Sequence, residues 1–188
     1  MAALIPDYDT VAKVTIIPRT NGAGGFTLFT PSDDRLDSGM YSMKYLKAQL
    51  SVALGGRVAE ELVFGTENVT TGASNDLQQV LRIARAMVTQ FGYSKRTLAP
   101  TAWETGNENG MSGKSSSSAT SNSIDEEVKK LTQDAYDVCY QTLKANMPLM
   151  DALVERLLES ETVDAGELQK LVFDFSEPID AAEAPVAA

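Results

Sequence analysis

Hydrophobic positions near the start of the chain recur with the short period of β-strands. Residues 11–18 (Val-Ala-Lys-Val-Thr-Ile-Ile-Pro) are β-branched and partly alternating, and Phe26-Thr-Leu-Phe29 has the same character. Gly22, Gly24 and Gly25 lie between the two segments, where glycine permits a turn. The pattern predicts a small β-hairpin whose first strand ends at its proline.

From Ser42 the apolar period changes to three and four residues, which is typical of a helix. The periodic positions run through Leu62, and Gly65 is expected to end the helix. Gly55-Gly56 lies in the interior of this helix and should cost about 1 kcal/mol per glycine relative to alanine. We expect another backbone to pack closely against these glycines.

The next segment has the clearest helical pattern. At 100° per residue, its apolar positions fall within about 120° of arc. They are Leu77, Val80, Leu81, Ala84, Met87, Val88 and Phe91. Gly92 occupies the place of a left-handed helix end, and residues 70–75 offer several side chains that could cap the helix start.

The rest of the chain is predicted to be helical after a polar interruption. Residues 105–123 are rich in Gly and Ser and predict a flexible surface loop. Capping boxes at Ser123-Ile-Asp-Glu126 and Asp164-Ala-Gly-Glu167 predict the starts of a long and a short helix, and Asn146-Met-Pro148 predicts the start of one between them. We therefore expect one mainly α domain over residues 2–176 with a small β-hairpin element. Residues 177–188, rich in Ala and Pro, are expected to be disordered.

Composition narrows the possible functions. Sixteen basic against 26 acidic residues give a net charge of −10, which argues against a nucleic acid as the main partner. No apolar run approaches the length of a membrane span, so we expect no membrane contact through this chain. Its single cysteine, Cys139, lies on an apolar stripe and is expected to be a buried, inert thiol. The chain has no histidine, which excludes any mechanism that needs an imidazole from within it.

Asp76 is the main candidate for chemistry. On a helical wheel it lies about 20° from Met87 and about 40° from Val80, so its carboxylate borders the apolar face. One interpretation is a first-turn aspartate stabilised by the helix dipole. The other is a metal ligand that points into a shared interior. A second acidic group, Glu60-Glu61 with Arg57, is interpreted as a charge cluster on a helix surface.

Several ordered segments together resemble one protein family. Thr70-Thr-Gly-Ala-Ser-Asn-Asp-Leu-Gln79 resembles the motif that supplies the third zinc ligand in FtsH-type ATP-dependent zinc metalloproteases of the M41 type. Five further segments resemble the same peptidase domain, in its order and at its spacing. They are Ile5-Pro-Asp-Tyr-Asp9, Val14-Thr-Ile-Ile-Pro-Arg19, Gly24-Gly-Phe-Thr27, Leu54-Gly-Gly-Arg-Val-Ala-Glu-Glu61 and Met87-Val-Thr-Gln-Phe-Gly92. The resemblance covers roughly residues 2–175 and is nearest to the plastid and cyanobacterial branch. It implies an FtsH peptidase-domain-like helical fold with Asp76 as zinc ligand.

The resemblance also implies the role of the intact protein, in which this chain would be the C-terminal proteolytic domain. Such a protein has membrane-anchored helices and an AAA+ ATPase module, which uses ATP and Mg. ATP hydrolysis draws damaged or unassembled membrane proteins into a homo- or hetero-hexameric chamber, where zinc-bound water cleaves them. The implied location is the plastid thylakoid membrane, with the peptidase domain on the stromal side and a role in photosystem II repair. The alternative is a bacterial or cyanobacterial membrane, with the domain at the cytoplasmic face.

The chain also departs from the family pattern. In the family, a His-Glu-x-x-His helix just upstream of the segment that resembles residues 2–6 supplies two zinc ligands and the catalytic glutamate. The chain begins at Met1, where that motif should have finished, so we expect a domain lacking its N-terminal metal-binding helix. Asp76 alone would not hold zinc, and the chain is expected to be inactive. We also expect the apolar stripe Val80–Ala84–Met87 to be exposed beside Asp76.

Other functions remain open. The family's mechanism implies that the strand Gly25, Phe26, Thr27 and Leu28 presents an edge to which a peptide substrate adds, and the alternative is an ordinary hairpin arm. The chain could instead be a non-catalytic assembly module of a hetero-hexameric ring. A third possibility is a helical adaptor whose family likeness is residual.

Overall fold

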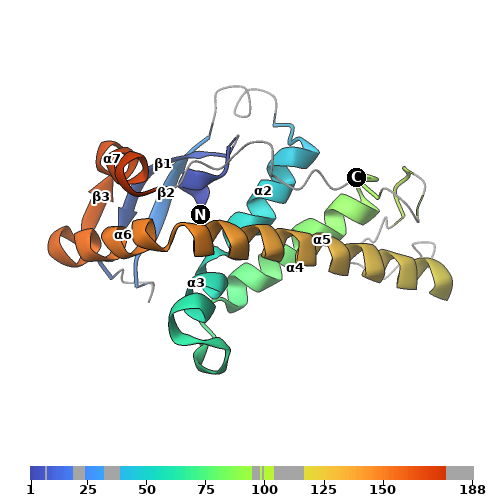
Figure 1. Cartoon of the computed structure of the whole chain (residues 1–188). Coiled ribbons are helices and arrows are strands. Elements are labelled where there is room, and N and C mark those ends of the chain that lie inside the picture. Colours follow the sequence, from blue (N-terminus) through green and yellow to red (C-terminus); the bar gives the residue numbers. More distant parts are fainter. Residues whose placement is uncertain are drawn as a thin grey trace. The chain divides into compact units, whose positions relative to one another are not determined.

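The computed structural model describes residues 1–6, 8–18, 24–31, 39–94, 98, 100–103 and 117–176. The chain divides into two compact units. Unit 1 comprises Met1–Tyr41 and Val138–Ala188, and unit 2 comprises Ser42–Asp137. Helix α5 (Ser118–Ala145) contributes its first part to unit 2 and its last part to unit 1 (Figure 1).

Unit 1 combines a small sheet with two helices that follow α5. Its elements are η1 (Ala2–Leu4), β1 (Thr10–Thr15), β2 (Phe26–Thr30), α6 (Met147–Ser160), β3 (Thr162–Asp164) and α7 (Ala165–Phe175). One buried cluster among them consists of Val11, Leu157, Val163 and Leu168, with Ala2, Val14, Phe29 and Leu153 packed against it. The sheet and the two C-terminal helices therefore share one hydrophobic cluster.

The sheet confirms the predicted hairpin and adds a strand to it. Its order is β2-β1-β3, and both pairings are antiparallel. Val14 lies opposite Thr27 of β2 and opposite Val163 of β3, and Val163 is fully buried. Strand β3 has only three residues, too few for an alternating pattern to be recognised in the sequence.

Strand β1 ends before the predicted proline. It stops at Thr15, where the Ile17 N–H donates to the Thr15 hydroxyl (3.2 Å) and the Ile16 N–H donates to the carbonyl of Glu161 (3.0 Å). The Ile16 N–H bond to Glu161 is in line with the pairing of Thr15 with Thr162, whereas the Ile17 N–H bonds to a side chain instead of a neighbouring strand. The pairing therefore goes no further, and Ile17 lies outside the strand despite its β-branched side chain.

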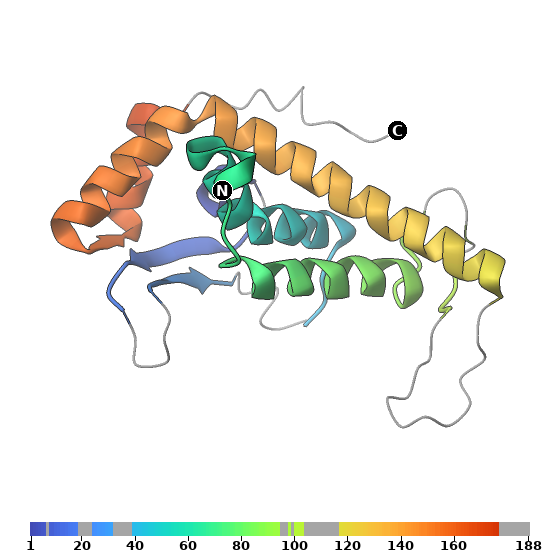
Figure 2. The ribbon, with the colours of Figure 1, turned by 90° about the horizontal axis from the view of Figure 1, so that it is seen from below.

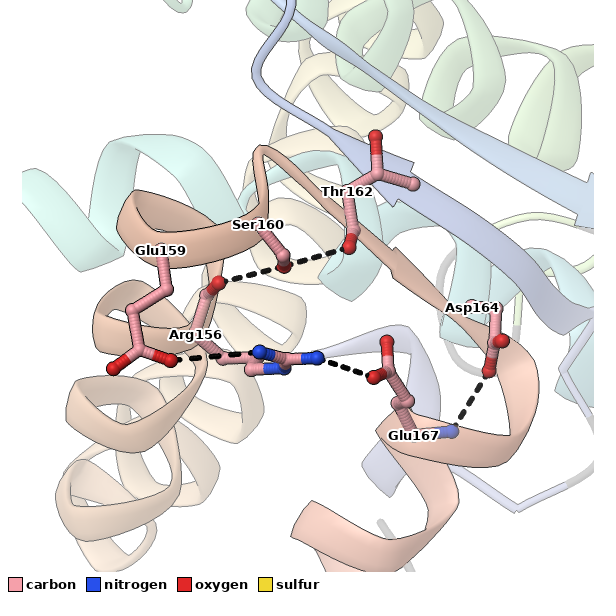
Figure 3. Close-up of polar contacts among 6 residues, drawn as sticks. All are labelled: Arg156, Glu159, Ser160, Thr162, Asp164 and Glu167. Atoms are coloured by element: carbon pink, nitrogen blue, oxygen red, sulfur yellow. Dashed lines mark hydrogen bonds and ion pairs between the residues drawn. The ribbon is translucent and has the colours of Figure 1, made fainter.

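A polar network organises the corner formed by α6, β3 and α7 (Figure 3). Arg156 donates to Glu167 (2.6 Å) and to Glu159 (3.4 Å), and the hydrogen bond to Glu167 raises the pKa of Arg156. The Asp164 carboxylate accepts from the Glu167 N–H (2.9 Å), which confirms the predicted helix start. Glu167 does not complete a reciprocal capping box, since its side chain bonds to Arg156 instead.

The described secondary structure of unit 2 consists of helices. These are α2 (Met43–Ala53), α3 (Gly55–Phe64), η2 (Thr66–Asn68), α4 (Ser74–Thr89) and the first part of α5. Its buried side chains include Leu46, Leu50, Leu54, Val58, Val80, Ala84, Met87, Val88, Ile124 and Val128. Helix α2 packs on α4, and the buried Ser51 hydroxyl donates to the carbonyl of Ala135 in α5 (3.1 Å).

The single helix predicted after Ser42 is two helices. Helix α2 begins with the Ser42 hydroxyl as its cap and ends at Ala53, and α3 begins at Gly55. The expected close packing is wrong at Gly56, because a Cβ there would have no described atom within 4 Å. The interruption reflects the low helix propensity of the glycine pair. The predicted end of α3 at Gly65, with φ of 79°, is confirmed.

The predicted exposed stripe on α4 is wrong. Val80, Ala84 and Met87 are at most 2% exposed, whereas Leu77 and Leu81 are 45% and 55% exposed. The apolar face of α4 is wider than the surface that neighbouring helices cover. The side of this face with Val80, Ala84 and Met87 is therefore buried, and the side with Leu77 and Leu81 is exposed. Gly92 has a positive φ of 66°, as predicted, but it lies beyond the helix, which ends at Thr89 with Gln90 as its cap.

Helix α5 begins earlier than predicted. It starts at Ser118, so residues 118–123 of the predicted loop are helical and Ser123 does not open the helix. The Ser117 hydroxyl accepts from the Thr120 N–H (3.2 Å), which supplies the cap that had been assigned to Ser123. Residues 105–116 of the predicted loop and the predicted tail at 177–188 lie outside the described residues.

The structure confirms a mainly α fold with a small antiparallel sheet. Among the residues that the structure describes, no helix has both the length and the apolar character that crossing a bilayer would require.

Candidate functional site

Asp76 lies in the first turn of α4 and is exposed. The residue before the helix is Ala73, which provides no side-chain cap. The carboxylate lies at the positive end of the helix dipole, which favours a negative charge. This position fits the helix-dipole interpretation. The exposed carboxylate does not point into a shared interior, as the metal-ligand interpretation expected, but it is accessible to a metal ion.

The segment before Asp76 is anchored to α3 by Glu60. The Glu60 carboxylate accepts from the Thr70 N–H (2.8 Å) and from the Thr70 hydroxyl (3.0 Å to Oε2 and 3.1 Å to Oε1). The interpretation of Glu60 as part of a surface charge cluster is therefore incomplete. Its carboxylate joins two segments ten residues apart in sequence.

Further hydrogen bonds order the connector that comprises residues 65–73, seen between α3 and α4 in Figure 2. The Thr70 hydroxyl accepts from the Gly72 N–H (3.2 Å), and the Thr71 carbonyl accepts from the Ser74 N–H (3.1 Å) and the Ser74 hydroxyl. Near the start of the connector, the Asn68 side chain donates to the carbonyl of Phe64 (2.8 Å). The connector thus follows a defined path into α4.

The predicted substrate strand lies in unit 1. Phe26, Thr27 and Leu28 belong to β2, and Gly25 immediately precedes it. Among the described strands β2 pairs only with β1, so it forms one edge of the sheet, and Leu28 is 51% exposed. Asp76 and β2 belong to different units of the chain. The edge position is consistent with addition of an extended peptide.

The donor groups in the described residues do not make a metal site. Nowhere in this part of the chain do three or more His, Cys, Asp or Glu side chains gather where a metal ion could be held. Zinc sites in proteins use three or four protein ligands, and the candidate segment provides the Asp76 carboxylate alone. The residues present do not fit a complete zinc site.

Cys139 is fully buried in the last part of α5. Burial raises the pKa of its thiol to about 11, and the charge of the Met1 amino group lowers it by a smaller amount. A thiol with a raised pKa is a poor nucleophile at neutral pH, because the thiolate is the reactive form. The structure therefore agrees with the inert thiol expected from the apolar stripe.

The Glu60 contact is the feature of this site that sequence reasoning missed. Glu60 and Thr70 are separated by the end of α3 and by η2, so no helical or strand period relates them. Neither residue type is distinctive by itself, because Glu is common on helix surfaces and Thr is common in turns.

Comparison with known proteins assigns the chain to a family. Peptidase family M41 matches residues 1–171. The ATP-dependent zinc metalloprotease FtsH 3 of Synechocystis sp. PCC 6803 is 53% identical over 180 residues, covering 92% of this chain and 29% of that protein. The chloroplastic FTSH 1 of Oryza sativa subsp. japonica and FTSH 5 of Arabidopsis thaliana are each 47% identical and each cover 93% of this chain.

This chain spans about a quarter to under a third of the length of these relatives, 29%, 26% and 25% respectively. The similarity therefore concerns one part of each longer protein. Because the family match extends over nearly all of the described sequence, the chain belongs to peptidase family M41 and is a peptidase domain of the FtsH type.

Proposed function

We propose that this chain is the C-terminal proteolytic domain of a membrane-anchored, ATP-dependent zinc metalloprotease. The family match and the names of the relatives support this proposal. The structural observation that carries it is the exposed Asp76 carboxylate in the first turn of α4, at the end of an ordered connector. In the longer protein, Asp76 supplies one zinc ligand, and the other ligands and the catalytic glutamate come from outside these 188 residues.

The chain by itself is proposed to be inactive. It contains no histidine, and its described residues offer no group of three metal-binding side chains. Zinc binding by Asp76 alone would leave most of the coordination to water, which does not give a stable protein site. The domain therefore depends on the longer protein for its metal and for proteolysis.

The cellular role follows the family context. ATP and Mg act in an ATPase module elsewhere in the longer protein, which forms a homo- or hetero-hexamer and delivers unfolded membrane proteins to the peptidase domains. The chloroplastic and cyanobacterial relatives support an origin in a plastid or a cyanobacterium. We place the protein in the thylakoid membrane with this domain on the stromal side, acting in photosystem II repair. This chain makes no membrane or nucleic-acid contact of its own.

Asp76→Asn in the longer protein tests the proposed ligand. The amide keeps the size of the side chain but removes its charge, so zinc content and casein cleavage should both be lost. Asp151→Asn is the matched control, since Asp151 is another exposed aspartate on a helix. Retention of stoichiometric zinc and cleavage by Asp76→Asn would exclude Asp76 from the metal site.

Metal analysis of the 188-residue chain tests the proposed inactivity. Elemental analysis should find no stoichiometric zinc, and neither casein nor short peptides should be cleaved. About one zinc ion per chain, removable by a chelator, would contradict the proposal.

A second candidate function is a non-catalytic assembly module of a hetero-hexameric ring. The genomic sequence upstream of Met1 separates the two candidates. An in-frame His-Glu-x-x-His motif supports an active parent, and its absence supports the assembly module. Sedimentation velocity of the 188-residue chain tests the assembly contacts themselves, and a single monomeric species at high concentration would argue against them.

A further inference from the structure

The start of α4 is held by a side chain from another helix. Glu60 of α3 receives both the backbone N–H and the hydroxyl of Thr70 on one carboxylate. Hydrogen bonds to a carboxylate are stronger than those between neutral groups, and two donors from one residue also fix its orientation. We propose that Glu60 is a positioning residue, which fixes Thr70 and thereby sets the path of the connector and the place of Asp76.

The contact extends from Thr70 to Gly72 through a shared hydroxyl. A threonine hydroxyl has one proton, and here that proton is donated to Glu60. Its lone pairs are then directed to other donors, and the Gly72 N–H lies 3.2 Å away. Loss of the Glu60 carboxylate would free the hydroxyl to rotate and weaken the hydrogen bond at Gly72.

The space around Gly72 supports this arrangement. A Cβ at Gly72 would lie 3.2 Å from the Thr70 hydroxyl and 3.7 Å from Glu60 Oε1. The connector backbone therefore lies directly against the Glu60–Thr70 contact. Even a methyl group at this position would require the threonine hydroxyl to move.

The effect reaches Asp76 because the helix start has no cap of its own. The residue before α4, Ala73, makes no side-chain cap hydrogen bond. The first helical contacts are instead the bonds from the Ser74 N–H to Thr71 and from the Leu77 N–H to Ala73 (3.0 Å), both with acceptors in the connector. A shift of the connector therefore moves the acceptors that define the first turn, which contains Asp76.

The positioning of Asp76 matters for zinc only if Asp76 is a ligand, so that part of the inference rests on the proposed function. The contact between Glu60 and the connector does not. The experiment therefore measures the connector directly in the 188-residue chain.

Amide hydrogen exchange measured by NMR tests the proposal. Glu60→Ala should speed exchange at Thr70, Gly72 and Leu77 by about tenfold or more, because local opening controls these amides. Amides deep in α2, such as that of Leu50, should not change. Glu60→Gln should lie between the native chain and Glu60→Ala, since the amide oxygen can still accept one donor. The carboxyl carbon resonance of Asp76 should shift in Glu60→Ala.

Glu61→Ala is the matched control, because it removes a neighbouring carboxylate from the same helix. The proposal is overturned if Glu61→Ala has the same effect, if Glu60→Ala leaves exchange at Thr70 and Leu77 unchanged, or if exchange rises equally at Leu50. Should Glu60→Ala fail to fold, Thr70→Val and Gly72→Ala disturb the same contact from the connector side, and unchanged exchange at Leu77 in both would equally overturn it. Loss of the ligand role in the Asp76→Asn experiment would leave these exchange results unaffected.

Discussion

The backbone of Gly25 approaches the carbonyl oxygen of Thr15 so closely that a Cβ on Gly25 would lie 2.3 Å from it. The hairpin brings the two residues together where β1 ends and β2 is about to begin. A Cβ would also lie 3.0 Å from the Cα of Ile16, so backbone atoms surround the position. Only a residue without a side chain fits this approach.

Gly25→Ala should therefore destabilise unit 1. Overpacking against backbone cannot be relieved by a side-chain rotation, so we expect a loss of about 1–3 kcal/mol in the free energy of unfolding. Urea denaturation of both proteins measures the loss. Gly24→Ala is the control, because no described atom lies within 4 Å of its Cβ position, and its cost should be clearly smaller. Equal costs for the two variants would contradict this account.

Thr15→Val should destabilise the junction between β1 and the α6–β3 turn. Thr15 is 4% exposed, and its hydroxyl donates to the Glu161 carbonyl (2.9 Å) and lies 3.1 Å from the Thr162 hydroxyl. Valine keeps the shape but removes the hydroxyl from these part-buried hydrogen bonds, which should cost about 0.5–1.5 kcal/mol. Thermal and urea unfolding would measure this cost. Thr10→Val, at the exposed start of the same strand, should change stability by less than about 0.5 kcal/mol.

The two aspartates at helix starts should respond differently to alanine. Asp164 caps α7 by accepting from the Glu167 N–H, so Asp164→Ala should cost about 0.5–2 kcal/mol. Asp76 lies inside the first turn of α4, where its dipole term of about 0.3–1 kcal/mol is offset by the better helix propensity of alanine. Asp76→Ala should therefore leave the melting temperature of this chain nearly unchanged. A larger loss for Asp76→Ala than for Asp164→Ala would contradict these roles.

The Cys139 thiol should make stability depend on alkaline pH. Its pKa is raised from 9.0 to about 11 by burial, so above pH 9 the unfolded chain loses this proton first. The contribution of the thiol is therefore fully present below pH 9 and is lost between pH 9 and pH 11, by about 3 kcal/mol at most. Urea unfolding at several pH values measures the loss. Other groups also titrate there, so the difference from Cys139→Ala isolates the thiol, and parallel pH curves for the two proteins would contradict the prediction.

The sequence determined the elements that depend on neighbouring residues. The hairpin, the end of α3 at Gly65, the turn at Gly92 and the start of α7 at Asp164 were all predicted correctly. Each depends on a local cause, such as β-branched alternation, the freedom of glycine at positive φ, or a cap within one turn. The resemblance to FtsH-type proteases was likewise evident from short ordered motifs, and the family match confirmed it.

Only the tertiary structure decided the contacts between distant segments. Strand β3 exists because β1 offers it a partner, and the Thr15 hydroxyl bonds to the carbonyl of Glu161, 146 residues away in sequence. Which edge of α4 is buried depended on the helices packed against it, and so Leu81 is exposed while Val80 is not. The hydrogen bonds between Glu60 and Thr70 likewise depend on the fold, which brings the connector against α3. The spacing of apolar residues in the sequence shows which face of its own helix or strand a side chain lies on. It does not show which other segment that side chain contacts, because the fold brings that segment close from elsewhere in the chain.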